Sequence, residues 1–420
     1  KKYYNYIMSK VSLYNKEMYG EVTTPTILID ELFDMLDNEI FSRKNIKWLD
    51  PCAGTGVFFK ELFKNRLTSL PNLKNKLFWI TEINPSHTKI LIEHFNEMVN
   101  IKNIDFLEFN EEKFDIIVAN PPFQVNGSIK VPTKKSDKCK DGKEMWSHFV
   151  KHAIELLKDD GILLCITPVI WLKRDHKMHD FLLKYKVEEM KCYDAGEANK
   201  LFKGNCQTPI VLFKLVKTPI TNKLQKVKVG EMMYSFLTDE SIPMKYYKEL
   251  SSLRTLVEKV GSLKVIKTSM RPGRPNNLMV SNERTGVYFY KNVKTCILKK
   301  YNGIISPELV IEYSNIPCVF SGKPKLILAH KMYGHSYFDK KGEYGISNRD
   351  NYVIVDYSKK EMEILNQFLN LPCIIKLFDA TRYRMRYLER YIFDFIPNIT
   401  SLPDFPKIIT EYSVKKYLKI

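Results

Sequence analysis

The sequence of 420 residues lacks the features that mark several classes of protein. No two of its eight cysteines form a CxxC pair, so neither a metal site nor a disulfide framework is predicted, and reduced thiols are expected. The longest strongly apolar run, residues 161–172, contains Pro168 and is shorter than the roughly 20 residues that span a bilayer. With no apolar stretch near the N-terminus either, we expect no membrane segment, no signal peptide and a cytoplasmic location.

Acidic residues are scarce in the second half of the chain. Overall, 66 Lys and Arg stand against 48 Asp and Glu, a formal net charge of +18. Residues 1–210 hold 31 basic and 29 acidic residues, whereas residues 211–420 hold 35 and 19. A genome that encodes Lys often would also give an excess, so the uneven distribution is the more informative observation. It favours a polyanionic partner for the second half, such as nucleic acid.

Apolar runs of strand length alternate with helical patterns through the first half. Strands are predicted at 46–49, 77–80, 114–119 and 161–167, and helices at 57–67, 85–99 and 145–157. This alternation is typical of βαβ units, so it predicts an α/β domain with a doubly wound parallel sheet. Two later strands, 187–193 and 209–215, have no clear helix between them and could form an antiparallel hairpin at the sheet edge.

The alternation fades after about residue 220, where a domain boundary is predicted. Short strand-like runs at 326–328 and 352–355 then mix with turn residues. We therefore predict one domain over residues 1–220 and a second, basic, mixed α+β domain over residues 221–420. Residues 126–143 hold six lysines and few apolar residues, which predicts a polar loop.

A glycine-rich turn, Asp50-Pro51-Cys52-Ala53-Gly54-Thr55-Gly56, follows the first predicted strand. Glycines between a strand and a helix let the backbone approach a ligand closely, and the helix N-terminus offers free N–H groups. An ordinary tight turn could have the same sequence, so the interpretation of this motif depends on the motifs that follow it. Glu82 follows the second strand, where a carboxylate can accept hydrogen bonds from a ribose diol. Asp105 and Phe106, at another strand end, suit an adenine ring and its amine.

The most informative segment is Asn120-Pro121-Pro122-Phe123, at the end of the third strand. Two consecutive prolines fix φ and remove two N–H groups, so carbonyl groups there can accept without competing donors. The Asn120 side-chain oxygen and the Pro121 carbonyl could both accept from one planar amine, and Phe123 could stack on the ring that carries it. A rigid turn is the alternative, but the other motifs lie at ends of strands in the same predicted sheet.

In this order, the motifs resemble those of S-adenosylmethionine-dependent adenine-N6 DNA methyltransferases of the gamma group. The pattern is of the Taq type, found also in the methyltransferase parts of fused restriction–modification enzymes. The resemblance covers roughly residues 19–216 and is most specific at 46–56 and 114–123. It implies a Rossmann-like class I methyltransferase sheet, S-adenosyl-L-methionine as the cofactor, and a C-terminal target-recognition domain.

The resemblance also implies roles for individual residues. Cofactor contacts would come from Val22, Thr23, Thr24, Pro25, Asp50, Cys52, Ala53, Gly54, Gly56, Glu82, Ile83, Asp105, Phe106 and Asn120. The catalytic motif would be Asn120, Pro121, Pro122 and Phe123, with Phe123 stacking on the flipped base. Phe202 matches a later motif more loosely, and it would either stack on the same base or be a core residue ahead of a strand.

The implied reaction is methyl transfer to N6 of an adenine flipped out of double-stranded DNA. Adenine N6 is a poor nucleophile because its lone pair is delocalised into the ring, and acceptors at Asn120 and Pro121 would favour a more pyramidal amine. An acidic base is not required, because the amine can lose its proton after transfer. Stacking on Phe123, worth about 1–3 kcal/mol, would offset part of the cost of flipping.

Basic side chains of the second half are candidate DNA contacts: Arg271, Arg274, Lys323, Lys325, Arg382 and Arg386. Residues 270–277 predict a rigid loop that presents two guanidinium groups, and residues 323–345 resemble a recurring piece of Taq-type recognition domains. On a helix, residues 381–391 would form adjacent stripes of Arg and Tyr. The arginines could contact bases or phosphates or be solvated, and the tyrosines are expected to pack on the core.

Other functions stay open at this point. RNA adenine and protein glutamine present the same planar amine, although Phe123 and the basic second half argue against glutamine. A decayed DNA-binding relative would be expected to lack motif residues, and none is missing. Only 19 residues precede Gly20, where a fused nuclease would be expected. We therefore expect a monomer that does not cut DNA itself and whose cognate restriction endonuclease, if one exists, is encoded separately.

Overall fold

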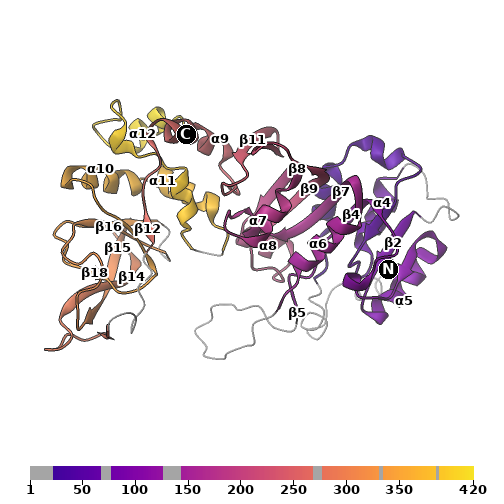
Figure 1. The fold of residues 1–420 in the computed structure, drawn as a ribbon, viewed down its shortest axis with the longest axis horizontal. Coiled ribbons are helices and arrows are strands. Elements are labelled where there is room, and N and C mark those ends of the chain that lie inside the picture. The colour runs from indigo at the N-terminus through magenta and orange to yellow at the C-terminus, as the bar shows by residue number, and fades with distance from the viewer. Residues whose placement is uncertain (1–21, 68–76, 126–142, 268–276, 331–333, 385–386) are drawn as a thin grey trace. The chain divides into compact units, whose positions relative to one another are not determined.

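The computed structural model describes residues 22–67, 77–125, 143–267, 277–330, 334–384 and 387–420, in two compact units, Lys1–Glu240 and Ser241–Ile420 (Figure 1). The division falls at residue 240 rather than at the predicted 220. The reason is that β10 (Leu224–Val229) and β11 (Met232–Leu237) extend the sheet of the first unit.

The first unit is built on a nine-stranded sheet, in the order β11-β10-β8-β9-β7-β4-β1-β2-β3. Its other strands are β1 (Trp48–Asp50), β2 (Phe78–Thr81), β3 (Asn100–Lys102), β4 (Phe114–Ala119), β7 (Leu157–Pro168), β8 (Tyr185–Tyr193) and β9 (Ile210–Pro219). Strands β3, β2, β1, β4 and β7 run parallel, and β9 lies antiparallel between β7 and β8. This is the doubly wound sheet that was predicted.

The predicted edge hairpin of the last two strands is wrong in two respects. Helix α8 (Ala195–Leu201) separates β8 from β9, and β9 lies inside the sheet. Residues 210–215 of β9 are all buried, as expected of an interior strand, and the one charged residue among them, Lys214, pairs with Glu188 at 3.0 Å.

Helices α4 (Val57–Asn65), α5 (Pro85–Phe95) and α6 (Trp146–Leu156) confirm the predicted alternation. Two further helices were not predicted, α3 (Thr26–Asp34) and α7 (Lys177–Leu182).

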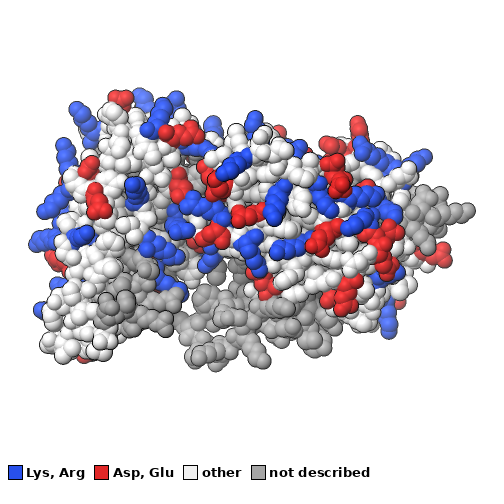
Figure 2. Space-filling view, viewed as in Figure 1, with Lys and Arg blue, Asp and Glu red and all other residues white. Residues whose placement is uncertain are grey.

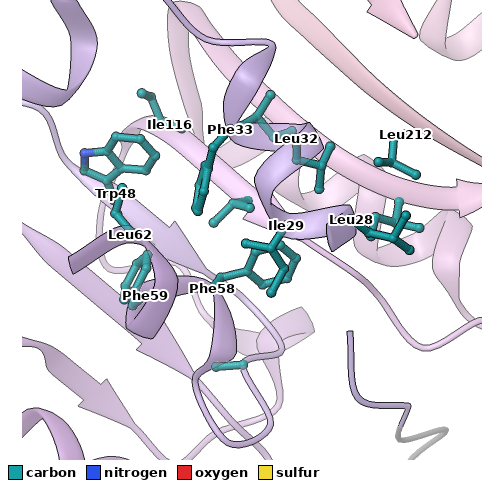
Figure 3. Packing of buried hydrophobic residues seen from close by; sticks show 14 of the residues in the cluster. Leu28, Ile29, Leu32, Phe33, Trp48, Phe58, Phe59, Leu62, Ile116 and Leu212 are labelled. Carbon is teal, nitrogen blue, oxygen red and sulfur yellow. The ribbon is translucent and has the colours of Figure 1, made fainter. Parts of the chain in front are cut away.

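Helix α3 is anchored in the main core of the first unit. Four of its side chains, Leu28, Ile29, Leu32 and Phe33, are 0% exposed. Figure 3 shows Phe33 beside Trp48 of β1 and Phe58 of α4, with ring centroids 6.4 and 6.5 Å from Phe33. Because α3 is fixed to the sheet in this way, the residues immediately before it have a defined position.

The described part of the second unit contains two four-stranded sheets, ordered β12-β19-β16-β17 and β13-β15-β14-β18. The strands are β12 (Ile266–Lys267), β13 (Val280–Ser281), β14 (Tyr290–Tyr301), β15 (Ile304–Ser314), β16 (Lys325–Ala329), β17 (Ser336–Asp339), β18 (Gly345–Ile346) and β19 (Asn351–Ile354). The helices are α9 (Tyr247–Val260), α10 (Lys359–Leu369), α11 (Pro372–Leu377) and α12 (Glu411–Leu418). The mixed α+β prediction is confirmed: the predicted run 326–328 lies in β16, and the run 352–355 lies in β19 except for its last residue.

In the described residues between 381 and 391, no continuous helix carries the Arg and Tyr stripes considered from the sequence. The short helix η6 (Phe378–Thr381) ends at the start of this segment, and η7 (Arg390–Asp394) begins near its end. The tyrosines there pack inward, as expected: Tyr383 and Tyr391 are 1% and 3% exposed. No helix among the described residues is both long and apolar enough to cross a membrane.

Candidate functional site

The motif residues of the first unit meet at one edge of the sheet. Strand β1 pairs in parallel with β2 on one side and with β4 on the other. The segments that follow these three strands, 50–56, 82–84 and 120–123, therefore lie at neighbouring carboxyl ends, where doubly wound sheets bind ligands.

The two glycines of the turn after β1 serve different purposes. Gly56, with φ of 78°, is the N-cap of α4, and a Cβ there would lie 2.5 Å from the Phe95 ring and 2.7 Å from Leu91. Close packing against α5 therefore requires Gly56. Gly54 also has a positive φ of 54°, but a Cβ there would meet nothing within 4 Å. The space beside Gly54 is open, as a ligand cradle requires.

Glu82 ties the turn after β1 to the turn after β2. Its Oε2 accepts from the Gly54 N–H at 2.7 Å, and its Oε1 accepts from the Asn84 N–H at 2.8 Å. The carboxylate is 7% exposed, and His87 Nδ1 lies 3.9 Å from its Oε1. The next residue, Ile83, is 47% exposed although it is apolar. An acceptor pair beside an exposed apolar side chain suits a ribose carrying an aromatic base.

Asp50 ends β1 as a buried acid. Its side chain is 0% exposed, and neither carboxyl oxygen has a hydrogen-bond partner among the described residues. Burial, together with the charge of Glu82, raises the pKa of Asp50 well above its ordinary value, and the nearby N–H of Cys52 opposes this shift. An unpartnered buried acid next to an open turn is a candidate partner for a cationic ligand.

Asn120 is held at two of its atoms. Its Nδ2 donates to Thr24 Oγ1 at 2.9 Å, and its backbone oxygen accepts from Cys52 Sγ at 3.5 Å. Thr24 is 6% exposed. The catalytic motif, the glycine turn and the segment before α3 are thus connected directly. The side-chain oxygen of Asn120 has no hydrogen-bond partner in the described part of the chain, so it remains free to accept.

The residues that follow Asn120 in the motif, 121–123, are also held in place. Pro121 is buried, and Phe123 packs against the main core while staying partly exposed. The Phe123 carbonyl accepts from the Met145 N–H at 3.2 Å, and the short strands β5 (Gln124–Val125) and β6 (Lys143–Glu144) pair immediately after it. The aromatic ring is therefore available at the same edge as Asn120.

The other aromatic candidates are less accessible. Asp105 caps η4 (Phe106–Glu108) by accepting from the Leu107 N–H at 3.0 Å. Phe106 is 2% exposed and lies against Phe149, with centroids 5.5 Å apart, so its contact with a nucleoside stays a prediction. Phe202 is 5% exposed within the main core. Of its two predicted roles, the structure favours the core residue, because the ring presents no free face for stacking.

The prediction that Lys325 contacts DNA is wrong. Its ammonium group is 0% exposed and donates to Asp339 Oδ2 at 2.6 Å and to the carbonyls of Phe320 and Lys323 at 3.1 and 3.0 Å. All three donors are thus used internally. Burial lowers the pKa of Lys325, and Asp339 opposes that shift. Lys325 is therefore a structural residue of the second unit.

The remaining candidate DNA contacts differ from one another in exposure. Lys323 is exposed, as a phosphate contact requires. Arg382 forms an ion pair with Asp379 at 2.5 Å, and its side chain is only 19% exposed. Arg271, Arg274 and Arg386 lie outside the described residues. In the part of the chain that is described, no cluster of His, Cys, Asp and Glu could hold a metal ion.

Two contacts at the site were not predicted from the sequence. Thr24 and Cys52 appeared only as candidate cofactor residues, whereas the structure joins both to Asn120. Thr24 lies 96 residues from Asn120, so no local pattern could have indicated the contact.

Comparison with known proteins matches a family model to residues within the first unit. Residues 4–202 match the model of the Eco57I restriction-modification methylase family. An "uncharacterized adenine-specific methylase" of Mycoplasma pneumoniae is 44% identical over 48 residues, or 11% of each chain. Modification methylase CviBIII of Paramecium bursaria Chlorella virus NC1A is 30% identical over 156 residues, or 36% of this chain and 38% of the relative. The chain thus spans well under half the length of either curated relative.

Among solved structures, the type IIG restriction endonuclease BpuSI aligns with 96% of this chain and 61% of its own, at 11% identity and a TM-score of 0.44.

Proposed function

Because residues 4–202 match the model of the Eco57I restriction-modification methylase family, we propose that this chain is a site-specific DNA methyltransferase that methylates N6 of adenine in double-stranded DNA. The observation that carries the proposal is the free side-chain oxygen of Asn120. Thr24 binds the side-chain nitrogen of this residue and Cys52 binds its backbone oxygen, beside the glycine turn. The names of the curated relatives, an adenine-specific methylase and a modification methylase, support the same reaction.

The residues at the sheet edge fit S-adenosylmethionine as the cofactor. Asp50 offers an unpartnered buried carboxyl group to a cation, Gly54 leaves open space, and Glu82 with the exposed Ile83 suits an adenosine. When bound, the cofactor supplies an activated methyl group on a sulfonium. Val22, Thr23 and Pro25, together with the backbone of Thr24, whose hydroxyl is bonded to Asn120, are proposed to hold its methionine end, since they precede α3 at the same edge.

The chain's own residues then prepare the adenine amine. The oxygens of Asn120 and Pro121 accept its two N–H groups, which localises the lone pair on nitrogen and stabilises the transition state more than the ground state. Phe123 supports the flipped ring by stacking. The site holds the amine in line with the methyl group, and positioning of this kind supplies much of the rate.

The second unit is proposed to hold the DNA. Residues 241–420 contain 30 Lys and Arg against 16 Asp and Glu, whereas residues 1–240 contain 36 against 32. The charge asymmetry therefore persists with the boundary that the structure gives. Figure 2 shows Lys and Arg side chains spread over the visible face of the second unit rather than gathered in one patch. We propose that the chain acts as a monomer, alongside a separately encoded restriction endonuclease.

The proposal is tested by incubating the protein with unmethylated genomic DNA and S-adenosylmethionine, followed by mass spectrometry of the nucleosides. N6-methyladenine formed by the wild type is the expected result, and sequencing of the product then gives the target sequence. A protein that binds cofactor but leaves DNA unmethylated would contradict the proposal. RNA and peptides containing glutamine would then be tested in the same assay.

Replacement of Asp50 should separate cofactor binding from stability. A raised pKa in the folded state means that stability falls as pH rises from the unfolded value, about 3.9, to the folded value. Asp50→Asn removes this loss and should raise the free energy of unfolding at neutral pH by about 1 kcal/mol. The same change should weaken the binding of S-adenosylmethionine about tenfold, because a cationic group of the cofactor loses its carboxylate partner.

The measurements for Asp50 are thermal unfolding without cofactor and calorimetric titration with it. Asp37→Asn is the matched control, because Asp37 is exposed and its side chain makes no cap hydrogen bond. An Asp50→Asn protein that binds cofactor as tightly as the wild type would exclude Asp50 from the cofactor site.

A further inference from the structure

The amide group of Asn120 can face the substrate in two ways. Rotation by 180° about its last torsion exchanges Oδ1, an acceptor, with Nδ2, which carries two donors. An adenine amine also carries two N–H groups, so only the orientation with Oδ1 outward can receive it. The reverse orientation would place donors against donors. Catalysis through Asn120 therefore requires a residue that fixes the amide.

Among the described residues, Thr24 is the hydrogen-bond partner of the Asn120 side chain. The Thr24 hydroxyl accepts from Nδ2 at 2.9 Å, which leaves Oδ1 clear. Cys52 holds the backbone oxygen of Asn120 at 3.5 Å and fixes the main chain, but it does not distinguish the two ends of the amide. A hydroxyl can also donate to Oδ1, so Thr24 fixes where the amide lies, and the observed bond from Nδ2 is the arrangement that leaves Oδ1 for the substrate.

The Thr24 hydroxyl is itself held in place by its surroundings. Thr24 is 6% exposed, so water does not readily replace the bond. It precedes Pro25, and a residue before proline is restricted to extended conformations. Pro25 is the N-cap of α3, and its carbonyl accepts from the N–H groups of Leu28 and Ile29. Since α3 is anchored in the core, the hydroxyl has one well-defined position.

We propose that Thr24 is a positioning residue for methyl transfer, which acts by accepting from Nδ2 and so holding the Asn120 amide in place while its oxygen receives the adenine amine. The proposal rests on the proposed function. It is also distinct from a contact between Thr24 and the cofactor, because a cofactor contact would change binding rather than the rate at saturation.

Thr24→Val keeps the shape of the side chain and removes the hydroxyl. At saturating S-adenosylmethionine and DNA, the single-turnover rate of adenine methylation should fall about tenfold, the effect of losing one ordering hydrogen bond. The dissociation constant for the cofactor should change by much less. Thr24→Ser, which retains the hydroxyl, should restore most of the rate. Thr24→Ala serves as a second variant if valine impairs folding.

Two controls make the test specific. Thr26→Val introduces the same change at an exposed position of α3 and should behave as the wild type. Adding Thr24→Val to Asn120→Ala should have no further effect, because the amide that Thr24 orients is gone. If Thr24→Val weakened cofactor binding and left the rate at saturation unchanged, the positioning role would be overturned. It would also be overturned if Thr24→Val lowered the rate of the Asn120→Ala protein as much as it lowers that of the wild type.

The hydrogen bond itself can be tested without activity. In protein labelled with ¹⁵N-asparagine, the side-chain amide signal of Asn120 is identified by its disappearance in Asn120→Ala. That signal should exchange with water faster in Thr24→Val than in the wild type. Equal exchange rates would overturn the inference. If the Asn120 amide exchanged slowly in a wild-type protein that methylated no DNA, the hydrogen bond would be supported and the proposed function would be wrong.

Discussion

Replacing Asn120 by alanine is expected to lower the rate of adenine methylation about 10²–10³-fold, the effect of removing one preorganised hydrogen-bond group that acts on the transition state. The reason is that the side-chain oxygen of Asn120 has no partner among the described residues, while its other atoms are held by Thr24 and Cys52. The acceptor is therefore already in place before substrate arrives. Single-turnover rates with labelled S-adenosylmethionine measure the loss.

The binding steps should be much less affected by Asn120→Ala. Glu82, Gly54 and Asp50 lie on the turns after β1 and β2, so cofactor affinity should stay within a few-fold of the wild type. Asn110→Ala, at an exposed position, is the matched control. If Asn120→Ala kept most of its activity, Asn120 would not be the acceptor, and the mechanism would have to place the amine elsewhere.

The site could be located from the sequence because its motifs are local and follow strands. The predicted strand 114–119 coincides with β4, and Asn120 directly follows it. An apolar run bounded by a proline pair leaves little freedom in where a buried strand ends. Once the sheet is parallel, the segments after its central strands must meet at one edge, so Asp50, Glu82 and Asn120 were placed together correctly.

The accessibility of individual side chains could not be predicted in the same way. Phe106 and Phe202 match motif positions, yet both are buried, because burial depends on helices packed from elsewhere in the chain. Burial of β9 as an interior strand was missed for a similar reason, since a short apolar run does not reveal its neighbours. The bond between Thr24 and Asn120 joins two motifs whose separation is set only by the fold.

Lys325 shows where charge alone misled the prediction. A lysine in a basic domain that is proposed to bind DNA is expected at the surface, and most lysines are exposed. Here Asp339 pairs with it from β17, the strand next to β16. Asp339 also accepts from the N–H groups of Glu343 at 2.9 Å and Tyr344 at 3.1 Å. The ion pair and these two contacts therefore fix the turn that follows β17, residues 339–344.

Lys325→Met is consequently expected to destabilise the second unit by about 3–5 kcal/mol, because it leaves the Asp339 carboxylate buried without its cation. Urea unfolding followed by circular dichroism measures the change, and the transition of the second unit should move to lower urea. Lys325→Met combined with Asp339→Asn should recover part of the loss, because both charges are then gone and the amide oxygen can still accept from a backbone N–H of the turn.

Lys323→Ala is the matched control, and it should give the opposite pattern. Lys323 is exposed, so its loss should change stability by no more than about 0.5 kcal/mol. If it contacts a phosphate, the salt dependence of DNA binding should become shallower by about one unit of slope. Folded Lys325→Met protein should keep the slope of the wild type. A stable Lys325→Met variant with a reduced slope would instead restore Lys325 as a DNA contact, and the ion pair with Asp339 would then have to open when DNA binds.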